Sequence, residues 1–365
     1  MITALIFILI LVVLVLIHEF GHYYAAKRMG VYVEEFGFGF PPRIIGKKIG
    51  ETLYSFNLIP LGGFVKLFGE EYHEKTSHKK GDNDTKQSIP ASRAFVNKKP
   101  WQKTIIIVAG VVMNFILGWI IISYLFTSGV PIPNGVKITS VAPGSPANSV
   151  GLEVEDVVTK LIYKDESTDI LTSQSLIATT QSYFDKKITI VIARKDKQLE
   201  FMLTPRSNPP NGEGSMGIVI EQMIEVKHYP WYTAPYHGLI HAFKTTGTIA
   251  VEIIKIPAGF MMHKKTSVDF AGPVGIAKVI GEARKYGISA LLEITALLSL
   301  NLAVINILPF PALDGGRLVF IIYEWVSGRK PNQNLERYMN MVGIVLLLAL
   351  SVLITIYDIQ KYWGT

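Results

Sequence analysis

Residues 1–30 read MITALIFILILVVLVLIHEFGHYYAAKRMG, and the rest of the chain is best understood from this stretch outward. Met1–Ile17 carries no charge and is almost wholly apolar. Continued to Ala26, the run is about long enough for a helix that crosses a bilayer. No basic segment or small-residue cleavage site precedes the polar residues that follow, so we expect a retained span and not a cleaved signal peptide.

The polar residues at the far end of this span read HEFGH, residues 18–22. On a helix, His18 and His22 are four apart on one face, so both imidazoles can reach one ion. Glu19 is adjacent and can contact a water held by that ion, which is the arrangement of zinc metallohydrolases. Ionisable side chains within a membrane helix each cost at least ~2.5 kcal/mol, so three together indicate a function. The alternative is an interfacial cap just outside the bilayer.

Composition places the chain among polytopic membrane proteins with one additional soluble domain. It has 365 residues and a mean hydropathy of +0.32. Cysteine is absent, so a zinc site must use histidines and carboxylates. The net charge of +7 reflects membrane topology and predicts no nucleic-acid partner. Four segments qualify as spans: Ile2–Ala26, Ile105–Phe126, Ile288–Leu313 and Met339–Tyr357.

Positive charge concentrates in two connecting segments, one between Lys27 and Lys103 and one after Asp314. By the positive-inside rule both are cytoplasmic, so both termini and the long middle segment are extracytoplasmic. Residues 31–70 alternate apolar residues with Gly and Pro, which predicts a β-element that dips into the bilayer beside the polar cluster. A small cytoplasmic β-domain is the alternative. Residues 71–100 have the composition of a cytoplasmic loop.

Residues 129–207 have the character of a soluble module. We expect strands at Val136–Val141, Lys187–Ala193 and Leu199–Thr204, and a helix around Ser173–Ser182. The pattern resembles a PDZ domain of the circularly permuted bacterial type, with Glu155 where that family usually has Gly. A PDZ groove binds peptides along a sheet edge. Residues 208–286 then read as a linker and a membrane-surface helix.

The third span ends in a second polar motif, NLAVINILPFPALDGG at 301–316. Pro309 and Pro311 break the helix and free backbone carbonyls near Asp314. An acid at such a broken end is the expected third ligand, because two histidines and one carboxylate leave the fourth tetrahedral position for water. The alternatives for Asp314 are a helix cap or a partner for Arg317.

These motifs together resemble the site-2 protease family, in the type of the bacterial regulator of sigma-E. The resemblance extends in order over nearly the whole chain. It departs at Val111, where the family usually has Pro after Gly110, and in having one PDZ-like module where the best-known member has two. The residues that carry it are HEFGH at 18–22, PLGG at 60–63, AGPVGI at 271–276 and the Asn306–Gly315 motif.

The resemblance implies that Glu19 is the catalytic acid/base and that His18, His22 and Asp314 bind one Zn²⁺ per chain. It also implies that 31–70 is a membrane-reentrant element and that Asn301 and Asn306 hold the substrate. A strand edge within Thr52–Leu67 would bind the unwound substrate, which makes Tyr54, Gly62 and Gly63 further candidate binding residues.

The expected fold is a polytopic α-helical membrane protein with about four transmembrane helices, the reentrant β-element and an inserted extracytoplasmic PDZ-like α+β domain. Its segments are 1–30 (first helix), 31–70 (β-element), 71–100 (loop), 101–128 (second helix), 129–207 (PDZ-like), 208–286 (linker and surface helix), 287–316 (third helix) and 317–365 (loop and fourth helix).

We expect an intramembrane zinc endopeptidase of the bacterial inner membrane, with its active site in the cytoplasmic half. Its substrates would be transmembrane segments of single-pass proteins, such as anti-sigma factors or signal-peptide remnants, whose tails the PDZ-like domain would contact. A second possibility is a non-proteolytic membrane scaffold or chaperone with a structural zinc, which would not need Glu19. A zinc transporter is a third, but the second and fourth spans carry too few polar residues for it.

Overall fold

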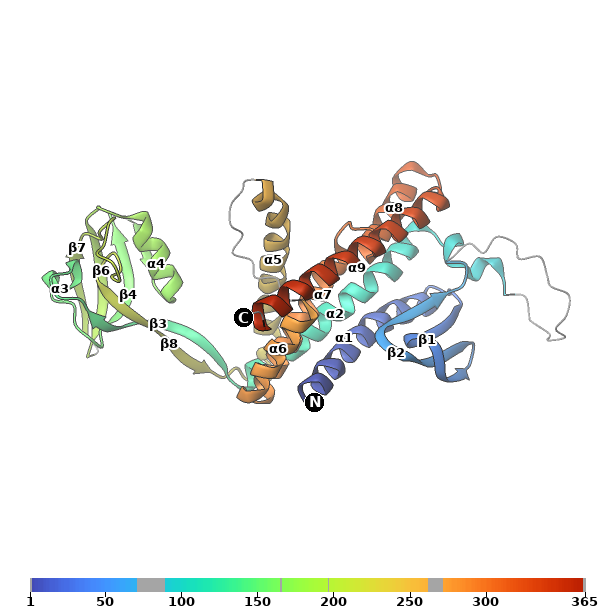
Figure 1. The fold of residues 1–365 in the computed structure, drawn as a ribbon, viewed down its shortest axis with the longest axis horizontal. Helices are drawn as coiled ribbons and strands as arrows, with labels where there is room; N and C mark the ends of the chain where they lie inside the picture. The colour runs from blue at the N-terminus through green and yellow to red at the C-terminus, as the bar shows by residue number, and fades with distance from the viewer. Residues whose placement is uncertain (1, 71–88, 165, 196, 262–271, 364–365) are drawn as a thin grey trace. The chain divides into compact units, whose positions relative to one another are not determined.

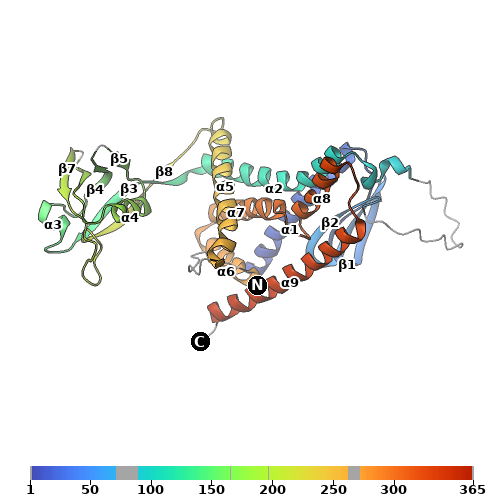
Figure 2. The same ribbon diagram turned by 90° about the horizontal axis from the view of Figure 1, so that it is seen from above.

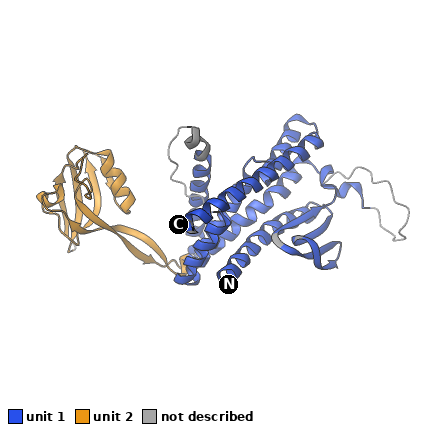
Figure 3. Cartoon of the chain, viewed as in Figure 1, with its two compact units in different colours: residues 1–125, 231–365 blue, residues 126–230 orange. Residues whose placement is uncertain are grey.

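The computed structural model describes residues 2–70, 89–164, 166–195, 197–261 and 272–363. Most of the predicted loop at 71–100 lies outside these residues, and its end forms the short helices η1 (Ala91–Arg93) and η2 (Phe95–Asn97). The chain divides into two compact units, one of residues 1–125 with 231–365 and one of residues 126–230 (Figure 3).

Within the described residues, four helices are long and apolar enough to cross a membrane. They are α1 (Ile2–Arg28), α2 (Pro100–Ser128), α7 (Ile288–Ile307) and α9 (Gln333–Trp363), all in the first unit except for the last residues of α2 (Figure 1). Each contains or overlaps one predicted span. The third span is shorter than predicted, because Leu308 has the extended conformation (φ −61°, ψ 142°) that a residue before proline favours. Residues 308–313 form a turn, and α8 (Asp314–Ser327) follows.

Three more helical segments precede α7: α5 (Ala234–Met261), α6 (Pro273–Ala283) and η3 (Arg284–Tyr286). The predicted membrane-surface helix corresponds to α5, and its relation to a bilayer stays a prediction. Helix α6 packs its Ile280 against Ile10 and Leu14 of α1. This apolar contact fixes α6 beside the N-terminal half of α1, in the same unit as the polar motif.

The predicted β-element at 31–70 is present as two antiparallel strands, β1 (Val33–Ile49) and β2 (Thr52–Leu67), packed against α1 (Figures 1 and 2). Both strands fold back on themselves, so that Phe36 pairs with Tyr54 and also with Val65. Tyr54 pairs with Phe36 and with Lys47, whereas Val65 has one partner. One open edge is therefore the end of β2 near Gly63–Leu67, the other is Arg43–Ile49 of β1, and Tyr54 lies inside the sheet.

The second unit holds the PDZ-like module. Its strands are β3 (Val130–Val141), β4 (Val157–Tyr163), β5 (Glu166–Asp169), β6 (Ile188–Arg194), β7 (Lys197–Leu203) and β8 (Ile218–Lys227). They lie in the order β7-β6-β4-β3-β8, with β5 paired to β4, and the helices are α3 (Pro146–Val150) and α4 (Ser173–Ser182). The core is aliphatic and includes Ile138, Leu161, Ile190 and Ile192.

Strand β8 corrects the predicted domain boundary. We expected the module to end at 207 and a linker to follow, but Ile218–Lys227 pairs with β3 over most of its length. The Pro/Gly/Asn segment 208–214 is thus a loop within the module and not its end. Beside β8 and α4 lies an apolar cavity of about 360 Å³, lined by Leu176, Met216 and Ile220 among others. No histidine or carboxylate lines it, so it offers no metal site.

Candidate metal centre

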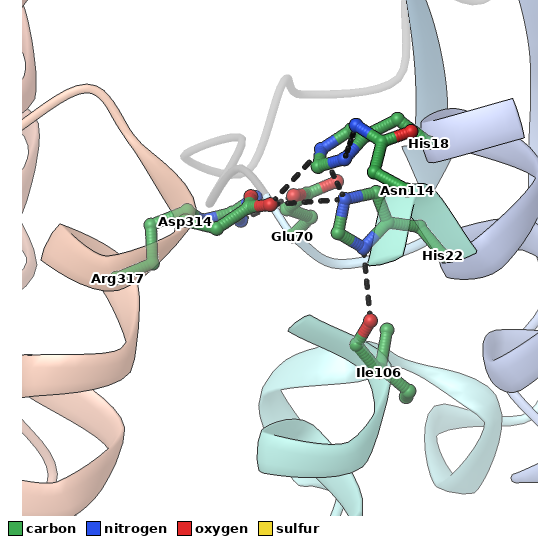
Figure 4. Close-up of polar contacts among 7 residues, drawn as sticks. All are labelled: His18, His22, Glu70, Ile106, Asn114, Asp314 and Arg317. Atoms are coloured by element: carbon green, nitrogen blue, oxygen red, sulfur yellow. Dashed lines mark hydrogen bonds and ion pairs between the residues drawn. The ribbon is translucent and has the colours of Figure 1, made fainter. Parts of the chain in front are cut away.

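Three potential ligand atoms converge in the first unit (Figure 4). His18 and His22 lie one turn apart on α1, and their Nε2 atoms are 3.1 Å from each other. Asp314, the first residue of α8, places Oδ2 3.1 Å from Nε2 of His18 and 3.2 Å from Nε2 of His22. Both histidines are buried. No other group of three or more such side chains comes this close among the described residues.

Hydrogen bonds on the far side of the rings determine what these atoms can do. Nδ1 of His22 lies 2.9 Å from the carbonyl oxygen of Ile106, which can only accept, so Nδ1 carries the proton. Nε2 of His22 is then a lone pair that points toward Oδ2 of Asp314. That oxygen is buried, and among the described residues it has no hydrogen-bond partner. Acceptor atoms that face one another at this distance repel unless a cation lies between them.

The donor set fits zinc. Two imidazole nitrogens and one carboxylate oxygen are ligands that Zn²⁺ accepts, and three protein ligands leave a fourth position open, as catalytic sites require. Tetrahedral ligands about 2.0–2.2 Å from one ion are roughly 3.3–3.5 Å from each other, close to the separations found here. The site is therefore already arranged for a cation of this size.

Asn114 and Ser299 support His18 from behind. The amide of Asn114 lies 3.4 Å from Nδ1 of His18, and its own Oδ1 is buried without a partner. If the side-chain amide of Asn114 is rotated by 180°, its Oδ1 accepts a hydrogen bond from the Nδ1–H of His18. This rotation satisfies Oδ1 and leaves Nε2 of His18 free for a metal. Ser299 Oγ donates to the backbone oxygen of Asn114 at 2.7 Å, and both residues are fully buried. These contacts join α1, α2 and α7 behind one ligand.

The ligands are positioned by glycines at two places where segments of the chain pack very closely. An added Cβ at Gly110 would overlap both imidazole rings, and one at Gly21 would overlap the Ala109 carbonyl, so α1 and α2 cross in near contact. At the other ligand, Gly315 and Gly316 pack against carbonyls of the turn between α7 and α8. Ala312 in that turn has φ 75°, a left-handed conformation that is costly for a residue with a side chain.

A cavity of about 200 Å³ opens onto the three ligands. Glu19 lines it, and Gly63 from the open edge of β2 is so close that an added Cβ would lie 3.0 Å from Cγ of Glu19. Ile106 and Ile107 form apolar wall. A half-buried carboxylate beside a metal site and a strand edge is suited to move a proton next to an extended peptide.

The predicted site residues are only partly brought together. His18, Glu19, His22, Gly63 and Asp314 line one cavity. The cavity lining does not include Gly62, Tyr54, Asn301 or Asn306.

The prediction that Tyr54 offers a strand edge to the substrate needs correction, because Tyr54 has a strand neighbour on each side. Its hydroxyl instead lies 2.6 Å from that of Tyr23. The expectation of an outward-facing Tyr54 is wrong because it took Thr52–Leu67 as one straight edge. Asn306 lies two turns after Ser299 on α7 and so shares its face.

Four residues at the centre were not predicted: Glu70, Gly110, Asn114 and Arg317 as an ion-pair partner of Glu70. We had weighed Arg317 as a partner of Asp314. A sequence signal existed only for Gly110 and Asn114, which lie in an apolar span where glycine and amide side chains stand out. The Glu70–Arg317 pair joins residues 247 apart, and no local pattern predicts it.

Comparison with known proteins agrees with this site. The model of peptidase family M50 matches residues 6–350. The chain belongs to peptidase family M50. A Clostridium perfringens protein described as a zinc metalloprotease is 33% identical over 349 residues, which cover 95% of each chain. The zinc metalloprotease RasP of Bacillus licheniformis is 28% identical, over 98% of this chain and 99% of its own.

Two further similarities are to a second protease named RasP and to a solved PDZ domain. The regulator of sigma-W protease RasP of Bacillus subtilis is 26% identical, over 98% of both chains. The solved PDZ domain of the SdrC-like protein of Listeria monocytogenes is 23% identical, covers 24% of this chain and 87% of its own, and has a TM-score of 0.21. The family membership and the four apolar helices identify a membrane protein of a peptidase family.

Proposed function

We propose that this protein is a zinc-dependent intramembrane endopeptidase that hydrolyses peptide bonds within transmembrane segments of other proteins. The observation that carries the proposal is the convergence of Nε2 of His18, Nε2 of His22 and Oδ2 of Asp314, within 3.2 Å of one another, at a helix able to span a membrane. These three residues would hold one Zn²⁺ per chain. When bound, zinc polarises a carbonyl and lowers the pKa of a coordinated water.

Glu19 has the position of a general base and acid. Its carboxylate lines the cavity that opens onto the ligands, so it can accept a proton from the attacking water and return it to the leaving amine. Asn114 and Ile106 keep the imidazole protons on Nδ1, away from the reaction.

The substrate would bind as an extended strand. The open edge at Gly63–Lys66 has no strand on its outer side among the described residues and lies beside Glu19, and a glycine at position 63 lets a second backbone approach closely. Asn301, Asn306 and Gly62 are proposed to contact the chain farther from the scissile bond. A helical segment must unwind to bind this way, because its own hydrogen bonds occupy the backbone groups that pair with the edge.

We place the protein in the bacterial inner membrane with both termini and the PDZ-like module extracytoplasmic. The distribution of Lys and Arg supports this orientation, which puts the metal in the cytoplasmic half. The substrates proposed are single-pass proteins of the anti-sigma-factor or signal-peptide type, whose tails the module would contact. The name of the Bacillus subtilis relative, a regulator of sigma-W, supports the first of these types.

The test separates metal binding from chemistry. Glu19→Gln should retain about one zinc per chain and lose cleavage, whereas Asp314→Asn should lose zinc as well, because a ligand is altered. Zinc content by mass spectrometry and cleavage of a model transmembrane substrate in proteoliposomes are measured together. Appreciable cleavage by Glu19→Gln would exclude the proposed mechanism. Normal function of a client without cleavage would instead favour a scaffold.

A further inference from the structure

A third acid, Glu70, lines the same cavity as the metal ligands and Glu19. Figure 4 draws Glu70 together with Asp314, Arg317 and the two histidines. Nothing in the proposed chemistry uses this group. Carboxylates are good zinc ligands, and a zinc ion with four protein ligands is a closed, structural site without a position for water. The molecule must therefore keep Glu70 away from the metal if the site is catalytic.

Arg317 provides that restraint. Its Nη2 donates to Oε1 of Glu70 in an ion pair, and the other oxygen, Oε2, accepts from the backbone N–H of Leu67 at 3.2 Å. Both carboxylate oxygens thus have donors outside the metal site. Arg317 lies three residues after Asp314 on α8, and its guanidinium is 6.0 Å from the ring of Phe95. The same helical turn therefore carries a ligand and the cation that holds the rival ligand.

The charges of the cavity are consistent with this role. Glu19, Glu70 and Asp314 contribute three negative charges, and Arg317 is the one cation among the residues that line it. A bound divalent ion brings the total to neutral, which a largely buried site favours. Without Arg317 one carboxylate charge has no counterpart among the described residues that line the cavity, and a bound metal ion is available to take that place.

We propose that Arg317 is a positioning residue that holds Glu70 off the metal and so preserves an open fourth position for water. The inference rests on the proposed function in one respect, since an open position matters only to a catalytic site. It makes an unusual prediction: loss of Arg317 should tighten metal binding while it lowers turnover. A residue that only supported the fold would weaken both.

The experiment compares four full-length proteins in detergent: wild type, Arg317→Gln, Glu70→Gln and the double variant. Arg317→Gln should lower the apparent zinc dissociation constant, and its cleavage of a transmembrane substrate should fall about ten-fold or more. In the Co²⁺-substituted protein, a hydroxamate should change the visible spectrum of the wild type but not that of Arg317→Gln. The double variant should recover cleavage and the hydroxamate response, because the competing carboxylate is gone.

Arg329→Gln is the matched control, because Arg329 is an exposed cation shortly after α8 and does not line the cavity. It should change neither metal affinity nor cleavage. Weaker metal binding by Arg317→Gln, or a double variant as inactive as the single, would overturn the proposal. The metal titration and the Co²⁺ spectra need no substrate. If wild type cleaves nothing, the proposed function fails while these measurements still decide the role of Arg317.

Discussion

Helix α1 presents two candidate metal ligands from one unbroken helical face. Asp314 reaches the same point differently: helix α7 ends, a turn follows, and Asp314 begins helix α8. The spacing of His18 and His22 is a property of any α-helix. The position of Asp314 depends on contacts from other elements, among them Gly315 against the turn carbonyls and Asn340 of α9, whose Oδ1 lies 3.4 Å from the Ala312 nitrogen.

This difference predicts how each part of the centre responds to mutation. The histidine pair keeps its internal spacing as long as α1 is helical, so only changes that move the whole helix or rotate a ring should disturb it. The aspartate can be displaced by changes far from it in sequence. Substitutions that alter packing without removing a ligand therefore test the comparison directly.

The largest effect is expected from Gly110→Ala. The added methyl group would overlap His22 Nε2 and His18 Cε1, so α2 must move away from α1 or the rings must rotate. Metal affinity should fall about a hundred-fold, at the upper end of the effect of groups behind a ligand. Zinc competition with a chelator measures it, and Val112→Ala, at an exposed position of α2, is the control. Unchanged affinity would mean that the helices do not cross in contact.

Removal of the support behind His18 should have a smaller effect. Asn114→Ala frees the ring to change tautomer and orientation, so metal affinity should fall about ten-fold while the fold survives. Asn114→Asp should retain more affinity than Asn114→Ala, because a carboxylate also accepts from Nδ1. Ser299→Ala, which leaves the Asn114 side chain in place, should lie between wild type and Asn114→Ala. An equal loss in all three variants would indicate a general packing defect.

The comparison also explains what the sequence could predict. Local periodicity, which one stretch of chain contains completely, predicts the His18–His22 pair and the four spans. It also predicts strands β3, β6 and β7 of the PDZ-like module. Asp314 could be proposed from the two prolines before it. The error at Tyr54 and the unpredicted Glu70–Arg317 pair share another cause, since both depend on which distant segments lie side by side.

Strand β8 shows a different failure, because its signal was present and was not used. Ile218–Lys227 begins with Ile-Val-Ile and ends with the alternating Ile-Glu-Val-Lys, but it follows the Pro/Gly/Asn segment at 208–214 that indicated a domain end. Gly110 stands out within its span, but its contact with the two histidines could not be predicted, because a glycine in a span does not reveal which helix it faces. Local pattern thus predicts the elements, and tertiary contacts decide which residues reach the cavity.

The turn before Asp314 should accept glycine at low cost. Ala312 has φ 75°, and a side chain in this conformation costs about 1–2 kcal/mol. Ala312→Gly removes that cost but adds freedom to the unfolded chain, so we expect a rise of about 0.5–1 kcal/mol in the free energy of unfolding. Ala312→Val should lower it and weaken metal binding. Thermal unfolding and zinc titration of both variants test this, and a less stable Ala312→Gly would contradict the assigned strain.

The smallest effect should come from the equivalent change in the second unit, at Glu155. This residue also has a left-handed backbone, φ 75°, at a position where PDZ domains of the resembled type usually have glycine. Its carboxylate lies 3.2 Å from Lys137 Nζ, but the Glu155 side chain is 73% exposed, so the pair contributes little, about 0–1 kcal/mol. Glu155→Gly loses that pair and gains the relief of strain, which leaves a net stabilisation of at most about 1 kcal/mol.

Glu155→Gln separates the two contributions, because it removes the charge and keeps the conformation. Hydrogen exchange of residues 126–230 within the full-length protein should be slower in Glu155→Gly than in wild type and slightly faster in Glu155→Gln. Metal affinity should be the same in all three, since neither His nor Asp ligands belong to this unit. Slower exchange in Glu155→Gln than in Glu155→Gly would show that relief of the left-handed backbone adds no stability here, because both variants lack the ion pair. A left-handed residue would then matter at Ala312, where it orients a ligand, and be nearly neutral on the surface of the module.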